Sequence, residues 1–359
     1  MSMHQEAGRR QFLKTALVAG GAAAGLPGCA TTAPDTLAQL YARARQEASV
    51  VYCGGGPAAA HRNSIEQFTK AYPGIEVKLV SGYSRDLVTG IDQQLAGNRV
   101  ETDLATLQTI QDYVRWRRAG ALLPYRGPEF GRVADTFKDP DGASVAVRVF
   151  ALAYGYNPDL VAPQDVPKSA LDFLHPRFSG KVISTYPHDD EITLYLYYTI
   201  VQKYGWGWLD RLLANQPRFI RGHLGTAQEV ARGRAAVSFD ISAGSTAAMT
   251  AAGGGRILVA FPAEDQVPIW ETRCGIFKQA KHPNAAKLFQ AFLLSSDYQA
   301  RQGVWSTRTD ATPAGGLKPI ASYNVASQFK DFIMNEPLVA DLRKRFEAAI
   351  GPVAGDIVL

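Results

Sequence analysis

Short apolar runs alternate with amphipathic stretches along most of the chain, a pattern that predicts strands followed by helices. The apolar run Ser49–Cys53 ends at Gly54, Gly55 and Gly56, which is typical of a buried strand and a tight turn. Further strands are predicted at 75–80, 103–107, 145–156, 181–184, 235–239, 256–261 and 269–277. Helices are predicted at 57–72, 87–95, 110–119, 191–203, 208–215, 283–294, 296–303 and 337–350. This order with short turns favours an α/β fold with mostly parallel sheets.

Two of these strands are long enough to pass from one lobe of the protein to another. A chain of 359 residues suggests about two domains, each with its own core. We expect 145–156 to cross to the second lobe and 269–277 to return. The resulting division assigns 48–149 plus 272–312 to lobe 1, and 150–271 plus 313–359 to lobe 2.

Composition and charge narrow the class of protein only slightly. The chain is 46% hydrophobic and 20% charged, which is ordinary for a folded protein. Its 38 Lys and Arg against 33 Asp and Glu give a net charge of +5. No basic stretch is long enough to indicate nucleic-acid binding, so no nucleic-acid partner is predicted.

The first residues are typical of an export signal. Arg9 and Arg10 precede a weakly apolar stretch at 15–25, which is too short to span a bilayer. The paired arginines resemble a twin-arginine signal at 1–28, although a small anchor helix is an alternative.

The signal ends in a sequence that resembles a bacterial lipobox. Leu26–Cys29 has this pattern, with Pro27 in place of the usual small residue, and the resemblance implies lipidation of Cys29. Residues 29–47 are then a tether and lead-in. The predicted location is the periplasm, with the protein anchored to a membrane face only by its N-terminal lipid.

Several segments, in consistent order over about 48–312, resemble a bacterial ABC-importer substrate-binding protein. They are Val50–Tyr52, Gly120–Pro124, Ala153–Asn157, Leu174–Lys181, Pro283–Lys287 and Phe292–Gln299. The similarity is to family-1 extracellular solute-binding proteins, in the branch of ferric, thiamine, phosphonate and polyamine binders. It implies a periplasmic binding protein type II fold, in which two mixed, mostly parallel sheets flanked by helices are joined by two hinge strands. It also implies a monomer that binds a small molecule between its lobes and works with an ABC permease and separate ATPase subunits. No cofactor is implied.

The ligand of such a fold is expected at the carboxyl ends of the strands. Ligands of open α/β sheets bind there, beside helix N-termini that carry unpaired N–H groups and partial positive charge. The predicted ligand-binding residues are Gly55, Gly56, Ser81, Tyr83, Thr109, Thr185, Tyr186, Asp240, Ser242, Trp270 and Arg273. Ordinary capping by Ser or Thr is the alternative interpretation of each loop.

The polar loops favour a small organic anion as ligand. Arg273 can pair with a carboxylate or phosphonate, or with a carboxylate of its own lobe. The acidic cluster His188–Glu191 suits a cationic amine if it faces the cleft. Otherwise its carboxylates stabilise the N-terminus of the helix that follows. A ferric-ion or ferric-chelate binder is a further alternative. The family's ferric members use two adjacent tyrosines where this chain has Asp240–Ala243, and Tyr197–Tyr198 is expected to pack inside a helix.

Two other classes of function are considered. Ser327 and Lys330 match the S-x-x-K pattern of penicillin-binding serine enzymes, so an exported serine hydrolase is one alternative. A ligand-sensing partner of a signalling receptor is the other. The six histidines show no metal-ligand spacing, so no metal site is predicted. The sequence has no H-E-x-x-H, C-x-x-C or G-x-x-x-x-G-K-[ST] motif, so the protein is predicted not to be an enzyme and to have no catalytic residues. Cys53 and Cys274 are expected to be free and packed.

Overall fold

The computed structural model describes residues 36–243, 254–301, 305–313 and 317–357, and all of them belong to one compact unit. The predicted export signal, the lipobox and Cys29 lie outside the described residues. Among the described helices, none combines the length and apolarity that crossing a membrane requires.

The strands follow the sequence prediction closely. They are β1 (Ser49–Gly55), β2 (Glu76–Gly82), β3 (Leu104–Leu107), β4 (Val145–Tyr156), β5 (Val182–Thr185), β6 (Arg218–Ile220), β7 (Val237–Ser242), β8 (Leu258–Ala260), β9 (Val267–Ile276) and β10 (Val325–Ala326). The boundaries of β4 are those predicted. The short strands β6 and β10 were not predicted, because two or three residues carry too little alternation to stand out.

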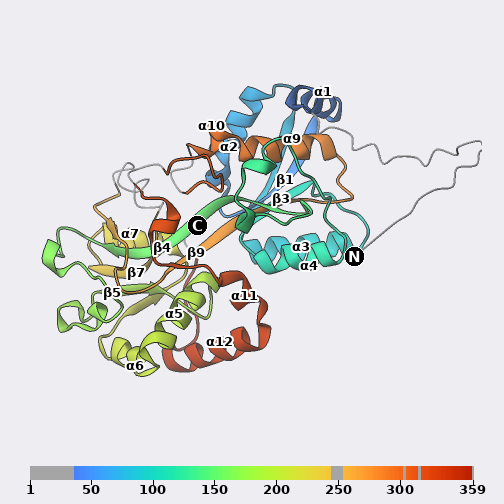
Figure 1. The fold of residues 1–359 in the computed structure, drawn as a ribbon. Coiled ribbons are helices and arrows are strands. Elements are labelled where there is room, and N and C mark those ends of the chain that lie inside the picture. The colour runs from blue at the N-terminus through green and yellow to red at the C-terminus, as the bar shows by residue number, and fades with distance from the viewer. Residues whose placement is uncertain (1–35, 244–253, 302–304, 314–316, 358–359) are drawn as a thin grey trace, which may run out of the picture. The chain divides into compact units, whose positions relative to one another are not determined.

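The strands join in one hydrogen-bonded order, β2-β1-β3-β9-β4-β7-β5-β6. Strands β1, β2 and β3 are parallel and form lobe 1, while β5, β6 and β7 are parallel and form lobe 2. The antiparallel pair β4 and β9 lies between them, with Val145 opposite Cys274 and Ala151 opposite Ile269. The two predicted sheets therefore share the two crossing strands, which run side by side through the middle of Figure 1.

The helices pack on both faces of each sheet. They are α1 (Leu37–Glu47), α2 (Ala58–Ala71), α3 (Ser84–Ala96), α4 (Ile110–Arg118), α5 (Glu191–Tyr204), α6 (Gly207–Ala214), α7 (His223–Ala231), α9 (Pro283–Leu294), α10 (Ser296–Gln299), α11 (Phe329–Met334) and α12 (Glu336–Ile350). Short 3-10 turns are η1 (Phe130–Arg132), η2 (Asp135–Phe137), η3 (Pro163–Asp165), η4 (Asp172–Leu174), η5 (Pro176–Phe178) and η6 (Ile320–Ser322). In lobe 1, α1, α2, α9 and α10 cover one face and α3 and α4 the other (Figure 1).

Helix α1 occupies part of the segment expected to be tether and lead-in. It begins with a capping box, in which Thr36 and Gln39 satisfy each other's backbone N–H groups. Leu40 and Ala44 are fully buried in the lobe 1 core. Glu47 accepts hydrogen bonds from the backbone N–H groups of Asn284 and Ala285, at the start of α9. The segment from Leu37 onward is therefore an integral part of lobe 1.

Each lobe has its own apolar core. The lobe 2 core packs α5, α6 and α12 against the sheet, and α7 covers the opposite face. Tyr197 is fully buried in it and donates a hydrogen bond to Ser184 Oγ, which confirms the expected packing role. Cys53 and Cys274 are free and buried, also as expected.

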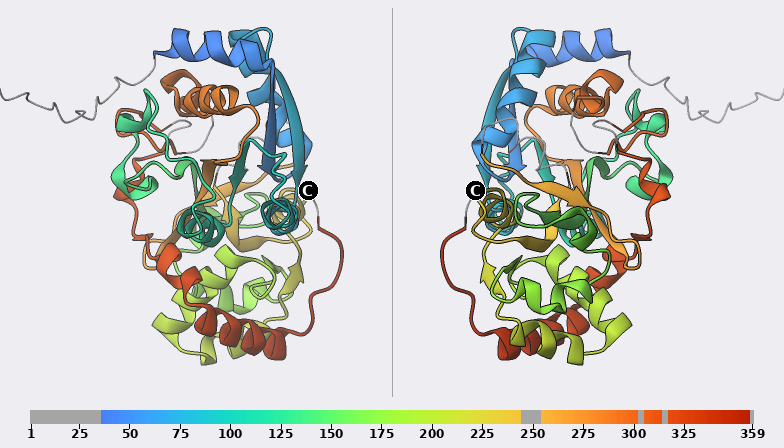
Figure 2. Two further views of the ribbon diagram at one scale, coloured as in Figure 1. Left: turned by 90° about the vertical axis from the view of Figure 1, so that its right-hand side faces the viewer. Right: turned by 90° about the vertical axis from the view of Figure 1, so that its left-hand side faces the viewer.

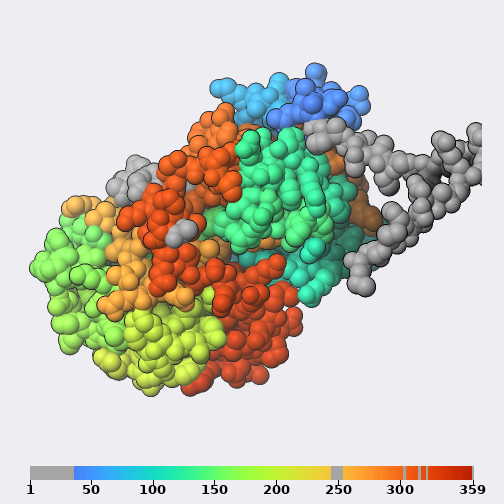
Figure 3. Space-filling view, viewed as in Figure 1, coloured from blue at the N-terminus to red at the C-terminus, as the bar shows by residue number. Residues whose placement is uncertain are grey.

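The C-terminal third of the chain returns across both lobes. After β9, the segments coloured orange and red lie between the green and yellow parts of the surface in the space-filling view (Figure 3). Beyond α12 the chain runs back towards the junction of the lobes (Figure 2), where Ile357 joins the lining of a cavity.

Candidate ligand-binding cleft

A cavity of about 230 Å³ lies between the lobes, at the carboxyl ends of their parallel strands. Its lining from lobe 1 consists of Gly56, Pro57, Tyr83, Ser84, Arg85, Gln108, Thr109 and Gln111. Its remaining lining consists of Asp189, Asp190, Glu191, Ile192, Gly222, His223, Leu224, Trp270, Phe329 and Ile357. The volume is below the roughly 300–1,000 Å³ of sites for drug-sized ligands, so the cavity suits a small one.

Five helices of nine or more residues begin at this cavity, and the six-residue α11 also begins there, at Phe329. Residues lining it form the first turn or the N-cap of α2, α3, α4, α5 and α7. The N-cap residues of α2, α3, α4 and α7 make no side-chain hydrogen bond to their first turns within the described structure. Only α5 among these five is capped, by the Asp190 carboxylate on the Thr193 N–H at 2.9 Å. Four uncapped N-termini thus direct partial positive charge towards one small volume.

The backbone conformation of the β1–α2 loop depends on the glycine at position 56. Gly56 has a φ of +101°, in the left-handed region that side chains disfavour. Its N–H donates to the Gly82 carbonyl at 2.7 Å, which ties the loops after β1 and β2 together. The backbone of both loops therefore lies at the cavity wall.

The acidic cluster faces the cavity, but each carboxylate already has a cationic partner. Asp189 accepts from Arg221 Nε at 2.8 Å. Glu191 Oε1 accepts from both Arg85 and Arg343, at 2.7 and 2.8 Å. These pairs leave the acidic side chains little unbalanced charge for a free cation.

Asp190 is paired with His223, whose Nε2 lies 3.4 Å from Asp190 Oδ1. Burial acts to lower the pKa of His223, but the charge of Asp190 outweighs it and the pKa is raised to about 9. Burial likewise acts to raise the pKa of Asp190, but His223 and Thr193 lower it to about 2. The imidazolium is therefore charged at neutral pH and balances the third carboxylate.

Two polar atoms on cavity-lining residues have no hydrogen-bond partner among the described residues. They are the indole Nε1 of Trp270 and the hydroxyl of Thr109. The Trp270 ring is 6% exposed and stacks on Phe150 with centroids 5.1 Å apart. A buried donor without a partner is unfavourable, so both groups are suited to a ligand oxygen.

The structure brings four of the predicted ligand-binding residues to the cavity, namely Gly56, Tyr83, Thr109 and Trp270. Gly55 is the last residue of β1 and Ser81 the last but one of β2, and neither lines the cavity. Thr185, Tyr186, Asp240, Ser242 and Arg273 do not line it either.

Asp240 does not line the cavity but holds the residues that lead into a cleft loop. It is fully buried, and its Oδ2 accepts hydrogen bonds from the Thr185 N–H at 2.6 Å and the Ser184 hydroxyl at 3.2 Å. Tyr186 packs its ring against His188 and Phe219. The sequence order located these loops correctly at the strand ends, but it could not show which side chains turn inward.

Arg273 likewise belongs to the interior. It is 3% exposed, donates to Glu271 Oε1 at 2.6 Å and lies 3.3 Å from Asp139. Its expected pairing with a ligand anion is therefore replaced by pairing with carboxylates of the chain. The functional residues that the prediction did not include are chiefly Arg85 and His223. Arg85 lies two residues after the predicted Tyr83, and only the fold brings His223 to the cleft.

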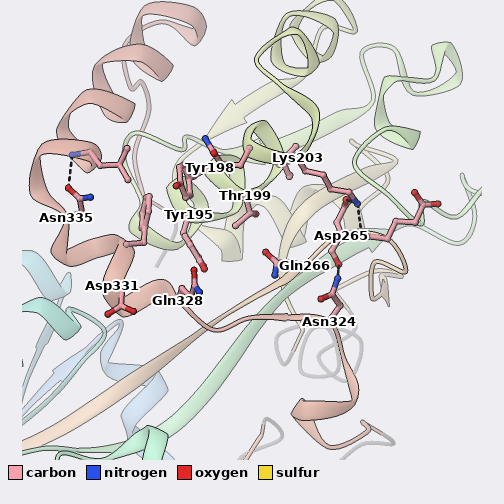
Figure 4. Close-up of a pocket in the computed structure, with 15 residues that line it drawn as sticks. Tyr195, Tyr198, Thr199, Lys203, Asp265, Gln266, Asn324, Gln328, Asp331 and Asn335 are labelled. Atoms are coloured by element: carbon pink, nitrogen blue, oxygen red, sulfur yellow. Dashed lines mark hydrogen bonds and ion pairs between the residues drawn. The ribbon is translucent and has the colours of Figure 1, made fainter.

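A larger cavity of about 600 Å³ lies wholly in lobe 2, away from these helix N-termini. Figure 4 shows it between α5, the start of β9 and the segment before α12, with Tyr198, Gln328 and Asn335 at its wall. Its Asp265 is already bonded to Tyr154, Lys203 and Tyr204. This cavity therefore lacks the converging donors of the interlobe cleft.

A cleft between two α/β lobes, with helix N-termini on both sides, defines a two-lobed receptor for a small solute. Residues 50–302 match the family of bacterial extracellular solute-binding proteins, and the chain belongs to this family. No curated protein matches the sequence significantly.

Solved structures share the fold at low sequence identity. Iron-bound HitA from Pseudomonas aeruginosa is 18% identical with a TM-score of 0.67, over 83% of this chain and 99% of that chain. AfuA from Actinobacillus pleuropneumoniae, solved with fructose 6-phosphate, is 18% identical with a TM-score of 0.67, over 84% and 98%. The substrate-binding protein of an ABC transporter from Agrobacterium tumefaciens is 14% identical with a TM-score of 0.69, over 84% and 94%. The fold is thus that of type II periplasmic binding proteins.

Proposed function

We propose that this solute-binding protein captures a small organic anion between its lobes and delivers it to an ABC importer. The observation that carries the proposal is the convergence of four uncapped helix N-termini on one cavity. Arg85 lines the same cavity, and the three carboxylates beside it are held by cationic partners. Oriented N–H groups of this kind favour carboxylate, phosphate or phosphonate oxygens.

Apolar and aromatic residues complete the lining and favour an organic ligand over an inorganic ion. Ile192, Leu224 and Phe329 line the cavity together with Trp270. Their surfaces suit carbon atoms of the ligand, while the helix N-termini hold its charged end. AfuA was solved with fructose 6-phosphate, so sugar phosphates belong among the candidate anions.

Ferric ion is the principal alternative. Hard Fe(III) requires several anionic oxygen ligands. Asp189, Asp190 and Glu191 would each have to give up a cationic partner to supply them. We therefore favour the organic anion, and a ferric chelate such as ferric citrate serves as the competing probe.

The ligand would act by shifting an open–closed equilibrium of the two lobes about β4 and β9. A ligand that contacts both lobes favours the closed form by its difference in affinity between the two forms. The closed form would then bind the permease, with transport driven by separate ATPase subunits. A sensor that uses the same closure for signalling is the second candidate.

The N-terminal residues would place this receptor outside the cytoplasm. We infer export by the twin-arginine route, removal of 1–28 and lipidation of Cys29, so that the folded part is held to a membrane face in the periplasm. A Cys29→Ser variant is expected to be released in soluble form and to lack the mass of a diacylglycerol group.

Ligand screening of the mature protein tests the main proposal. Thermal unfolding would be followed with carboxylates, sugar phosphates, phosphonates, amines, thiamine and ferric citrate, since a ligand that binds the folded state raises the midpoint. The proposal expects a rise with one class of anion and an increase in compactness by small-angle X-ray scattering. Stabilisation by amines or ferric citrate alone would refute the anion assignment.

A further inference from the structure

A second cavity of about 190 Å³ adjoins the cleft, and Trp270 and Phe329 line both. The rest of its lining consists of Ile110, Thr136, Phe137, Ile269, Glu271, Ser327, Lys330 and Asp331. Ile110 is the first residue of α4, whose N-cap Thr109 lines the cleft itself. The two cavities therefore share a wall, and residues of both lobes line the second one.

Glu271 is the buried charged residue of this second cavity. It is 7% exposed, and its Oε1 accepts a hydrogen bond from Arg273 Nε at 2.6 Å. Its Oε2 has no partner among the described residues and is closed to solvent in this conformation. A buried carboxylate oxygen without a donor is unfavourable, so the site is completed by a group that donates a hydrogen bond.

The charges around Glu271 favour a positively charged donor. Arg273 lies between Glu271 and Asp139, so that two buried carboxylates share one guanidinium. Ser144 donates its hydroxyl proton to Asp139 and accepts a hydrogen bond from Arg273. Its single donor proton is therefore already used within this cluster. Burial raises the pKa of Glu271, while Arg273 and Lys330 act against the rise. A cation placed beside Oε2 would balance the remaining negative charge.

Two charged side chains at the same cavity are less suited to this role. Lys330 and Asp331 are both exposed, and they carry opposite charges. No hydrogen bond joins Lys330 to Glu271 within the described structure, nor does one join it to Ser327. Ser327 is exposed, so the S-x-x-K pattern contributes a cavity wall and not a buried nucleophile.

We propose that this cavity is a second subsite of the cleft, in which Glu271 accepts a hydrogen bond from a primary ammonium group of the ligand. The ligand is then a zwitterion, with its anionic end at the helix N-termini and its carbon chain along Trp270 and Phe329. This inference rests on the proposed function and adds the ligand's second functional group. Because both lobes line the cavity, opening of the lobes gives the ammonium group access to Glu271. Binding transfers no proton.

The test compares matched probes that differ only in the amino group. Dissociation constants of the mature protein would be measured by calorimetry for ω-amino acids of two to six carbons and for the plain alkanoic acids of the same lengths. The pair 2-aminoethyl phosphate and ethyl phosphate tests the same difference on a phosphate head group. A buried charge-assisted hydrogen bond predicts tighter binding of the amino probe by about tenfold or more. One probe length should bind most tightly, because the distance between the anion site and Glu271 is fixed by the structure.

Two variants assign that preference to Glu271 and its cavity. Glu271→Gln keeps the shape and should reduce the ratio of the two constants to about one, while plain acids still bind. Ser327→Phe fills the cavity from an exposed position, leaves the buried ion pairs intact and should have the same effect, which covers the case in which Glu271→Gln does not fold. Glu66→Gln removes an exposed carboxylate on α2 that lines neither cavity, and should leave the ratio within about twofold of the wild type.

The possible failures are distinguishable. Equal binding of amino and plain probes, an unchanged ratio in Glu271→Gln and Ser327→Phe, or an equal loss in Glu66→Gln would each overturn the ammonium subsite while leaving the anion site standing. If neither series nor either phosphate binds, the subsite fails, and the proposed function fails with it only if the thermal screen also finds no anion that stabilises the protein.

Discussion

The guanidinium of Arg85, on α3 of lobe 1, donates a hydrogen bond of 2.7 Å to the carboxylate of Glu191, at the start of α5 in lobe 2. Arg343 of α12 donates to the same oxygen at 2.8 Å. Beside this bridge the Tyr83 hydroxyl donates to the Asp189 carbonyl at 3.4 Å. These contacts join the lobes across the cleft, so the structure has the interlobe contacts expected of a closed receptor.

Loss of the Arg85–Glu191 bridge should favour the open form. Because half of the Arg85 side chain is exposed, we expect Arg85→Met to cost at most about 1 kcal/mol of closure. This corresponds to a severalfold weaker affinity for the anion. Scattering should show a larger radius of gyration than the wild type under the same conditions.

Arg62→Met is the matched control, because Arg62 is an exposed arginine on α2 and does not line the cleft. It should alter neither affinity nor radius. High salt should reduce the difference between wild type and Arg85→Met, since exposed charges are screened. An Arg85→Met protein with unchanged affinity and radius would show that the bridge does not hold the lobes together.

The ion pair of His223 with Asp190 predicts a stability difference that depends on pH. The pKa of His223 is raised from 6.5 to about 9, so the pair's contribution is fully present below about pH 6.5 and is lost as pH rises through about 9. The pKa of Asp190 is lowered to about 2, so on the acid side the contribution is present above about 3.8 and lost as pH falls through about 2. His223→Gln should therefore be less stable by about 2 kcal/mol at pH 6, and by less at pH 9.5.

Urea unfolding of wild type and variant at the two pH values measures this difference. His175→Gln, at an exposed histidine, is the control and should lower stability by no more than about 0.5 kcal/mol at either pH. A deficit of the same size at pH 6 and pH 9.5 would contradict the charged pair.

Asp240 should prove to be a support for the cleft loops and not a ligand contact. Asp240→Asn replaces an acceptor with an amide that faces donors, so about 2 kcal/mol of stability should be lost. Binding of the anion, measured well below the unfolding temperature, should change by less than about threefold. Asp210→Asn, at an exposed aspartate on α6, should lower neither quantity. Weak binding with unchanged stability would instead support the sequence prediction that Asp240 contacts ligand.

Helix α1 should contribute to the stability of lobe 1. Leu40 is fully buried, so Leu40→Ala should cost about 2–4 kcal/mol in urea unfolding. Leu37→Ala, at a leucine that is 37% exposed, should cost less than about 0.5 kcal/mol. Equal and small effects would mean that this segment is only a lead-in to the fold, as the sequence predicted.

Local patterns were sufficient for most of the fold. The apolar run at Val145–Tyr156 predicted β4 to the residue, and the helix predicted at Pro283–Leu294 has the bounds of α9. Both are long and mostly buried, and burial imposes a predominantly apolar sequence on them. Helix α1 was missed despite its capping box at Thr36 and Gln39, because only Leu40 and Ala44 of its residues are buried.

The site was only partly predictable for a related reason. The strand ends and helix starts that form the cleft follow from the order of elements, and Gly56 and Thr109 follow from that order as well. Whether Arg273 reaches a ligand depends on Glu271 and Asp139, and whether the acidic cluster attracts cations depends on Arg221, His223 and Arg343. Most of these partners are distant in sequence from the residues with which they pair. The spacing of residues along the chain therefore does not identify them.

The sequence by itself determined an α/β fold with two long crossing strands and polar loops at the strand ends, because each of these features is a local pattern of polarity and turn residues. Only the tertiary structure decided which carboxylates are paired, which helix starts meet at one cavity, and that Glu271 remains buried with one oxygen unpartnered among the described residues. The reason is physical: a charged group's effect depends on its distance from other charges and from solvent, and those distances are set by contacts between residues far apart in the chain.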